Sequence, residues 1–239
     1  MPDTAKTTSG KPARGGLLAA ARQAVARRHL SLPGLEPTSR LFGFDRGQPI
    51  DRYYIENFLN THCQDVRGRV LEIADNDCTT RFGGDRVTHS EVLMATPAPN
   101  ATIVGDLADG ANIPDDTFDC FILTQTLLVV YDVHAALKTT HRILKPGGVV
   151  LITVPGISQI SRYDADRWGD FWRFTPQCVQ RLLTETFRPE DVAVTAHGNV
   201  RVAAAFLDGR ASQELDTGDL DYHDPDYPLV VTARAVKQS

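Results

Sequence analysis

The sequence lacks any apolar run near the roughly 20 residues that a helix needs to cross a bilayer. Its first 30 residues alternate arginine with small residues and contain no apolar signal-peptide core. The four cysteines, Cys63, Cys78, Cys120 and Cys178, stand far apart with no CxxC pair, which favours neither a zinc site nor a disulfide framework. We therefore expect a cytoplasmic protein with buried thiols, without a membrane span or a metal site.

The composition of the chain is that of an ordinary globular protein. Hydrophobic residues make up 42%, charged residues 23% and aromatic residues 8% of the 239 residues. These proportions exclude disordered, collagen-like and coiled-coil classes for the chain as a whole. The length suits one domain, or one domain with a short appendage, that buries a sizeable core.

The net charge of −5 hides a basic start and an acidic remainder. Residues 1–40 carry seven basic and two acidic side chains, a net charge of +5, which leaves −10 for the rest of the chain. An acidic body offers no long electrostatic track for a polynucleotide, so nucleic acid is an unfavoured partner. The basic start keeps RNA methylation open as an alternative. A homodimer is compatible with the sequence.

Two segments precede the main domain. In the first, residues 16–29 can form a short helix, which two prolines and a glycine then interrupt. In the second, DRYYIENFLNTHC (51–63) has apolar residues at helical spacing, with Asp51 as an N-cap. We expect a flexible basic extension over residues 1–40, a helical cap over 41–68 and the main domain over 69–239.

From Arg69 onward, predicted strands alternate with predicted helices. The pattern predicts strands over residues 69–74, 86–93, 101–107, 118–124, 149–155, 192–198 and 228–237. It predicts amphipathic helices over residues 133–145 and 175–187. Such alternation favours parallel strands joined by right-handed crossovers. We therefore expect an α/β fold, a doubly wound and mainly parallel seven-stranded sheet with helices on both faces.

Four segments in this pattern carry a family resemblance. They are VLEIADND (70–77), SEVL (90–93), VGDLADGANIPDDTFDCFIL (104–123) and HRILKPGGVVLITVP (141–155). Together they resemble the class I S-adenosylmethionine-dependent methyltransferases, and the similarity spans roughly residues 50–236. GQPIDRYYIENFL and GDFWRFT look like small bacterial members that act in glycan or secondary-metabolite pathways. The resemblance implies a Rossmann-like domain, S-adenosyl-L-methionine as the cofactor and a transferase role in biosynthesis.

The first of these segments departs from the glycine loop of the family. Glu72 keeps the acidic residue, but Ala74, Asn76 and Asp77 stand where the resemblance implies glycines. Glycine suits such a loop because the backbone approaches the ligand closely, sometimes with a positive φ. Asn and Asp tolerate the left-handed region better than most residues, so we expect Asn76 and Asp77 to hold the turn with an altered fit.

The resemblance also implies a role for residues after the next two strands. Glu91 follows Ala74 by seventeen residues, close to the roughly 20-residue spacing at which an acid accepts ribose hydroxyls. Asp106 matches the position that receives the adenine amino group, and the backbone of Leu107 would meet the ring. The expected cofactor-binding residues are Tyr53, Glu72, Ala74, Asp75, Asn76, Glu91, Val92, Asp106, Leu107 and Gln125.

The predicted helix before the sheet can add contacts to the same cofactor. An aromatic face such as that of Tyr53 would attract a sulfonium by a cation–π interaction. Arg52 or Arg81 can pair with the methionine carboxylate, because a guanidinium binds a carboxylate bidentately.

Methyl transfer to a hydroxyl also requires that its proton be removed, usually by a histidine or a carboxylate. The candidate catalytic residues are His197, at the end of the strand over 192–198, and Asp164 and Asp166, in the loop after the strand over 149–155. That loop is rich in aromatic residues that can stack on a sugar or a flat metabolite. The expected acceptor-binding residues are Tyr163, Trp168, Trp172 and Arg173.

The sequence thus predicts an S-adenosylmethionine-dependent methyltransferase that acts on a small polar acceptor, an oxygen of a sugar or of a secondary metabolite. The missing glycines support an alternative from another class. In that alternative the chain is a catalytically weak cofactor-binding partner or a regulatory subunit of a biosynthetic enzyme.

Overall fold

The structure, a computed structural model, describes residues 34–238. The chain divides at residue 37 into two units, and the elements below all belong to the second unit, residues 38–239. The helix expected over residues 16–29 lies outside the described residues. No helix in the described part is long and apolar enough to cross a membrane.

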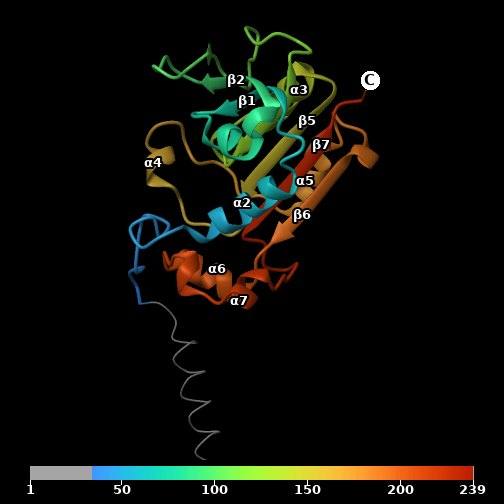
Figure 1. The fold of residues 1–239 in the computed structure, drawn as a ribbon. Helices are drawn as coiled ribbons and strands as arrows, with labels where there is room; N and C mark the ends of the chain where they lie inside the picture. The colour runs from blue at the N-terminus through green and yellow to red at the C-terminus, as the bar shows by residue number, and fades with distance from the viewer. Residues whose placement is uncertain (1–33, 239) are drawn as a thin grey trace, which may run out of the picture. The chain divides into compact units, whose positions relative to one another are not determined.

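The second unit is built on one seven-stranded sheet of order β3-β2-β1-β4-β5-β7-β6 (Figure 1). β1 to β5 pair in parallel, whereas β7 pairs antiparallel with both β5 and β6. The predicted mainly parallel, seven-stranded sheet is therefore confirmed. The strands are β1 (Gly68–Ile73), β2 (Val87–Met94), β3 (Ile103–Val104), β4 (Phe118–Thr124), β5 (Leu144–Pro155), β6 (Val192–His197) and β7 (Val230–Val236).

The strand order reverses between β1 and β4. From β1 the chain proceeds to β2 and β3 on one side, and it then returns to β4 and β5 on the other side. In such sheets ligands bind outside the carboxyl ends of the two strands at which the order reverses, and we call this position the crevice. β6 runs in the same direction as β5, because both are antiparallel to β7, so its carboxyl end lies at that edge too.

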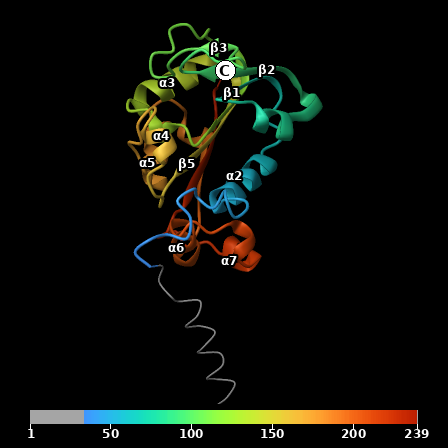
Figure 2. The ribbon, with the colours of Figure 1, turned by 90° about the vertical axis from the view of Figure 1, so that its left-hand side faces the viewer.

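Helices cover both faces of the sheet (Figures 1 and 2). α3 (Val133–Ile143) and α5 (Pro176–Leu183) pack in one buried cluster together with Leu71 of β1. α2 (Ile50–Thr61) and α6 (Val200–Leu207) pack in a second cluster together with Val70, the preceding residue of β1. Adjacent strand residues point to opposite faces, so both faces of the sheet are buried, as a parallel sheet requires.

Two short helices lie in connecting segments at the carboxyl edge. α4 (Arg162–Ala165) belongs to the loop that follows β5, and α7 (Thr217–Asp221) lies between β6 and β7. In Figure 1, α4 lies on the side to which the arrowheads of β1 and β2 point. These segments therefore border the edge at which ligands bind in such sheets.

The third strand is much shorter than its apolar pattern predicts. A strand is expected over residues 101–107, but only Ile103–Val104 pairs with β2. The chain turns directly afterwards, where the carbonyl of Asp106 accepts hydrogen bonds from the N–H groups of Asp109 and Gly110. The turn removes Asp106 from the sheet and leaves its side chain exposed.

Two local predictions on helices are wrong. α2 starts at Ile50 behind Pro49 as its N-cap, not behind Asp51. Asp51 lies in the first turn instead, where a negative charge stabilises the helix N-terminus. Cys178, expected to be buried, is exposed on α5 because it lies outside the apolar stripe formed by Val179, Leu182 and Leu183.

Candidate functional site

The loop after β1 begins with an alanine in the left-handed region of backbone space. Ala74 has a φ of 71°, which glycine adopts readily and other residues adopt at a cost. Its N–H donates to the carbonyl of Leu93 in β2 (3.2 Å), and its carbonyl accepts from the side-chain amide of Asn100 (2.9 Å). Backbone strain held in this way is typical of functional positions.

The loop side chains after Ala74 are exposed at the carboxyl edge of β1. Asp75 accepts a hydrogen bond from the N–H of Asp77 (3.1 Å), and the side-chain amide of Asn76 donates to the hydroxyl of Ser90 (3.1 Å). Neither Asn76 nor Asp77 has a positive φ. The prediction that these two residues hold a left-handed turn is therefore wrong, because the turn is made one step earlier, at Ala74.

The buried carboxylate of Glu72 fixes the shape of this loop. The residue is only 2% exposed. Its carboxylate accepts hydrogen bonds from the N–H (2.7 Å) and hydroxyl (2.7 Å) of Thr79 and from the N–H of Cys78 (3.2 Å). Burial raises the pKa of Glu72, and these hydrogen bonds oppose the rise. The carboxylate is committed to the short π turn Thr79–Gly83, so Glu72 shapes the loop through its backbone.

The loop after β4 begins with a second left-handed residue. Gln125 has a φ of 47°. Its N–H donates to the carbonyl of Thr153 in β5 (2.8 Å), and its side-chain amide lies 3.3 Å from the hydroxyl of the same threonine. Among residues 34–238 only four non-glycine residues have a positive φ. Two of them, Ala74 and Gln125, thus lie at the ends of the two strands that flank the crevice.

Glu91 and Val92 lie inside β2, and their polar groups are already bonded to neighbouring residues. Glu91 pairs with Leu71 inside β2, three residues before the strand ends, and its carboxylate accepts from Nε (3.2 Å) and Nη2 (2.7 Å) of Arg69. Burial opposes ionisation of Glu91, but hydrogen bonds from Thr102 and Arg69 outweigh it and lower its pKa. Val92 is buried, and its N–H and carbonyl both bond to Thr102.

Asp106 and Leu107 follow the carboxyl end of β3. One carboxylate oxygen of Asp106 accepts the N–H of Ala108 (2.8 Å), and within residues 34–238 the other oxygen has no hydrogen-bond partner. Leu107 is buried beside the exposed Asp106. The pair therefore offers one free acceptor next to an apolar side chain.

Helix α2 connects the loop after β1 to the segment between β6 and β7. Glu56 forms an ion pair with Arg81 (2.6 Å) in the π turn of that loop, and the hydroxyl of Tyr53 donates to Asp221 of α7 (2.6 Å). The guanidinium of Arg52 has no hydrogen-bond or ion-pair partner in the described part of the chain. The positive charge of Arg52 partly counters the rise that burial and Glu72 cause in the pKa of the Cys78 thiol.

His197 lies in a packed corner at the end of β6. Its Nε2 is 3.0 Å from the hydroxyl of Thr232, and its ring stacks on Tyr54 with centroids 5.5 Å apart. Burial and the nearby His223 lower the pKa of His197 to about 4, so the ring is neutral at pH 7. His197, Tyr53 and Tyr54 line a small cavity of about 120 Å³.

The strand order separates His197 from the crevice. β7 and β5 lie between β6 and β4, which amounts to three strand spacings, or about 14 Å. Direct proton transfer requires hydrogen-bond reach. The structure therefore does not bring His197 together with Gln125. The role of His197 as a base stays a prediction, and its distance from β4 does not support that role.

Residues 156–175 form the loop that follows β5, and Arg173 is its internal anchor. The five N–H donors of Arg173 bond to the carboxylate of Asp170 and to the carbonyls of Ser158, Gln159 and Trp172. The side chain of Asp170 is only 1% exposed. Arg173 has no donor left for an acceptor, so the expected role in acceptor binding is corrected to one in folding this loop.

The other residues predicted in this loop are accessible. Tyr163 and Trp168 are exposed, and their rings are in edge contact at 5.8 Å. Asp166 forms an exposed pair with Arg162 (3.6 Å), and Asp164 lies one helical turn away from Trp168. Both carboxylates thus remain candidates for contact with an acceptor.

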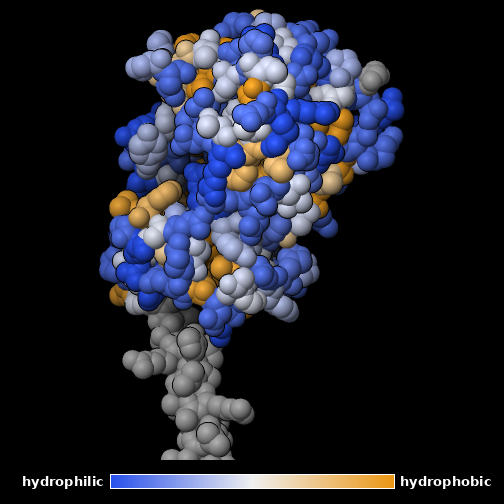
Figure 3. Space-filling model, in the orientation of Figure 1, coloured by the Kyte–Doolittle hydropathy of each residue, from blue (hydrophilic) through white to orange (hydrophobic). Residues whose placement is uncertain are grey.

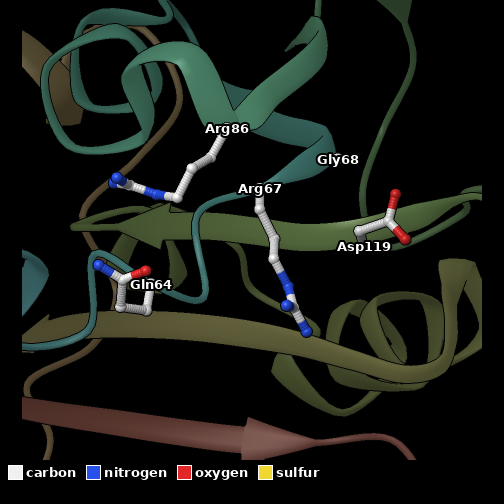
Figure 4. Close-up of a pocket in the computed structure, with 5 residues that line it drawn as sticks. All are labelled: Gln64, Arg67, Gly68, Arg86 and Asp119. Atoms are coloured by element: carbon white, nitrogen blue, oxygen red, sulfur yellow. The ribbon is translucent and has the colours of Figure 1, made fainter.

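A separate cavity of about 510 Å³ lies at the opposite, amino edge of the sheet (Figure 4). It is lined by Gly68 at the start of β1, Asp119 at the start of β4, and Gln64, Arg67 and Arg86. Figure 4 shows the guanidinium groups of Arg67 and Arg86 pointing apart, so they do not converge on one ligand. The cavity is not continuous with the loops at the carboxyl edge.

Comparison with known proteins adds a family and a fold. A family model described as a methyltransferase domain matches residues 33–192. The chain is 33% identical over 102 residues to the ubiquinone/menaquinone biosynthesis C-methyltransferase of Enterobacter sp. (strain 638), a match that covers 41% of this chain and 39% of that protein. The corresponding protein of Marinomonas sp. (strain MWYL1) is 33% identical over 85 residues, or 36% and 32% of the two chains. The match thus spans less than half the length of these curated relatives.

Among solved structures, the fold is similar to that of the N-methyltransferase NodS from Bradyrhizobium japonicum WM9, determined in complex with S-adenosyl-L-homocysteine. The TM-score is 0.51 at 14% identity, and the match covers 91% of this chain and 98% of that one. At this identity the likeness concerns the fold, which is Rossmann-like.

Proposed function

Because the chain belongs to the methyltransferase domain family, we propose that it transfers the methyl group of S-adenosylmethionine to an oxygen of a small polar acceptor, a sugar or a secondary metabolite. The observation that carries this proposal is the pair of left-handed residues, Ala74 and Gln125, at the ends of the two strands that flank the crevice. The family establishes a methyltransferase, and the acceptor is the proposed part.

The residues around the crevice suit such a cofactor. The turn at Ala74 lets the backbone approach a ligand closely. The guanidinium of Arg52, which has no partner among residues 34–238, suits the methionine carboxylate. The oxygen of Asp106 that has no partner among the same residues suits the adenine amino group beside Leu107. Glu91 is the exception, because a contact with the ribose would require it to leave Arg69. We therefore assign the ribose contact to the exposed loop at Asp75 rather than to Glu91.

When bound, the cofactor supplies an electrophilic methyl group on a sulfonium. Transfer of that group is an in-line displacement, so the chain contributes mainly alignment and exclusion of water. The loop over residues 156–175 is placed to do both, because the N–H groups of Phe171 (2.8 Å) and Trp172 (3.3 Å) donate to the carbonyl of Leu128 in the loop after β4. Gln125 lies at the start of that same loop.

A hydroxyl acceptor must also lose its proton. Asp164 and Asp166 are carboxylates on the loop after β5, and β5 is the direct neighbour of β4. We therefore place the base role on these two residues ahead of His197, which is three strand spacings from β4. A carboxylate in hydrogen-bond reach of the hydroxyl would add roughly 10² to 10⁴ in rate.

Calorimetric titration with S-adenosylhomocysteine tests the cofactor assignment. We expect micromolar binding to the full chain, weaker binding after Arg52→Met and unchanged binding after Arg81→Met, because Arg81 is already paired with Glu56. Absence of binding to folded protein would contradict the proposal. Binding of S-adenosylmethionine without its conversion to S-adenosylhomocysteine in the presence of any offered acceptor would favour the second candidate, a cofactor-binding partner with little turnover.

A further inference from the structure

Three aromatic side chains form one exposed cluster across two loops. Tyr131 follows β4, and Phe171 and Trp172 follow β5; we call these three residues the aromatic platform. The rings of Phe171 and Trp172 lie 5.3 and 5.9 Å from that of Tyr131. Tyr131 is 72%, Phe171 48% and Trp172 37% exposed. Single exposed apolar residues are normal on a protein surface, but a contiguous aromatic group is typical of a binding site.

Backbone contacts hold the aromatic platform in place. The N–H groups of Phe171 and Trp172 share the carbonyl of Leu128, and the indole N–H of Trp172 donates to the carbonyl of Val130 (3.1 Å). Gly169 has a φ of +98°, and a Cβ there would lie 2.3 Å from the ring of Phe171. The rings are thus ordered before any ligand arrives, which lowers the entropic cost of binding.

The aromatic platform offers ring faces and no unpaired charge. The indole N–H is already used, so Trp172 can contribute only its ring. Residues 156–175 contain three arginines and three aspartates and are neutral overall. Arg173 is fully bonded within the loop, and the guanidinium of Arg167 lies over the ring of Tyr163 at 3.8 Å. Arg162 is exposed and pairs with Asp166 (3.6 Å), so each of the three arginines of this loop already has a partner.

The location ties the aromatic platform to the candidate site. Its residues come from the loops that leave the carboxyl ends of β4 and β5, which are neighbours in the sheet. Gln125 begins the first of these loops, six residues before Tyr131. In Figure 1 the second loop, with α4, lies at the same edge as the ends of β1 and β2.

We propose that the aromatic platform binds the methyl acceptor and that this acceptor is a neutral ring, which stacks on Tyr131, Phe171 and Trp172. The shared chemistry is a flat apolar face, which a sugar ring presents through its C–H groups and an aromatic metabolite through its π system. A phosphorylated acceptor or a nucleotide would find no charge partner there. This proposal rests on the proposed function, because it names the class of acceptor for that reaction.

The two tryptophans of the chain allow a direct test. Trp168 and Trp172 both lie in the loop over residues 156–175, so tryptophan emission reports this loop alone. The variant Trp168→Phe leaves Trp172 as the single reporter. Methyl β-D-glucopyranoside and 4-methylcatechol serve as the neutral sugar and neutral aromatic probes, and glucose 6-phosphate serves as the charged probe. Saturation-transfer NMR measures the same binding from the side of the probe.

We expect at least one neutral probe to change the emission of Trp172 and to bind more tightly than glucose 6-phosphate. Tyr131→Ala is the cleanest variant, because the side chain is highly exposed and makes no hydrogen bond in the described part of the chain. Tyr131→Ala and Phe171→Ala should each weaken that binding by about two- to tenfold. Tyr227→Ala removes an exposed aromatic ring between β6 and β7 and should leave the binding unchanged.

The proposal is overturned if neither neutral probe binds, if glucose 6-phosphate binds as well as the neutral probes, or if Tyr131→Ala and Phe171→Ala bind them as wild type does. Calorimetry with S-adenosylhomocysteine on the same proteins separates the two hypotheses. Cofactor binding without binding at the aromatic platform contradicts only this inference. Absence of cofactor binding to the wild-type protein contradicts the proposed function instead.

Discussion

Arg69 holds the carboxylate of Glu91 through Nε (3.2 Å) and Nη2 (2.7 Å) inside two paired strands, β1 and β2. The two residues lie two positions apart in the strand register, since Glu91 pairs with Leu71. Glu91, which its spacing from Ala74 would assign to the ribose, is therefore the ion-pair partner of Arg69 within the sheet.

The first prediction concerns this ion pair. Glu91→Gln should change the affinity for S-adenosylhomocysteine by less than about twofold. It should lower the free energy of unfolding by about 1 kcal/mol or less, because Arg69 is partly exposed and solvent screens the pair. Titration calorimetry and urea unfolding measure the two quantities. A loss of affinity of about tenfold or more without a change in stability would show instead that Glu91 contacts the cofactor.

The same pair predicts a pH dependence. The folded state lowers the pKa of Glu91, so the stabilisation is present above the unfolded pKa and is lost as pH falls through the folded value. The difference in stability between wild type and Glu91→Gln should therefore be largest near pH 7 and shrink in acid.

Strands were predicted best where apolar residues fill both faces. The strand over residues 118–124 was predicted to the residue, because Phe118, Cys120, Phe121, Ile122 and Leu123 are all fully buried in β4. The apolar pattern failed at residues 101–107, where it cannot report that the chain turns at Asp106.

The loop after β1 was recognised because it directly follows a predicted strand, but its left-handed turn lies at Ala74, earlier in the loop than predicted. The ion pair of Glu91 was missed because counting residues from Ala74 does not reveal the strand register. The aromatic platform depends on contact between two loops about 40 residues apart, so Tyr131 and Phe171 carried no local signal.

The second prediction uses the backbone strain at Ala74. Ala74→Gly should raise the free energy of unfolding by up to about 1 kcal/mol, because glycine adopts a φ of 71° without the steric cost of a Cβ. Binding of S-adenosylhomocysteine should be kept or slightly tightened. Ala74→Val should lose both stability and binding, because a β-branched residue fits left-handed backbone poorly. Equal behaviour of the two variants, measured by urea unfolding and calorimetry, would show that the loop is not left-handed in solution.

The third prediction concerns Arg173 and Asp170. Arg173→Lys replaces the five donors of a planar guanidinium with a single ammonium group, so the buried carboxylate of Asp170 should be left poorly paired. The free energy of unfolding should fall by about 2 to 4 kcal/mol. The change should appear as altered tryptophan emission, because both tryptophans lie in this loop. Arg162→Lys is the matched control, since its pair with Asp166 is exposed and contributes little. Wild-type emission and stability in Arg173→Lys would show that the anchor is not needed.

The last prediction separates a structural from a catalytic His197. Burial lowers the pKa of His197 to about 4, below the ordinary value of about 6.5 in the unfolded chain. As pH falls from 6.5 towards 4, His197 becomes protonated in the unfolded chain but stays neutral in the folded state. The free energy of unfolding should therefore decline by about 1 to 3 kcal/mol over this window. His197→Gln should flatten this decline, because glutamine does not titrate and can still bond to Thr232. His134→Gln, a change at an exposed histidine, should keep the wild-type profile.

If His197 packs rather than catalyses, His197→Gln should retain turnover at pH 7 within about threefold of wild type. A loss of turnover of 10²-fold or more, with cofactor affinity and folding intact, would instead make it the base.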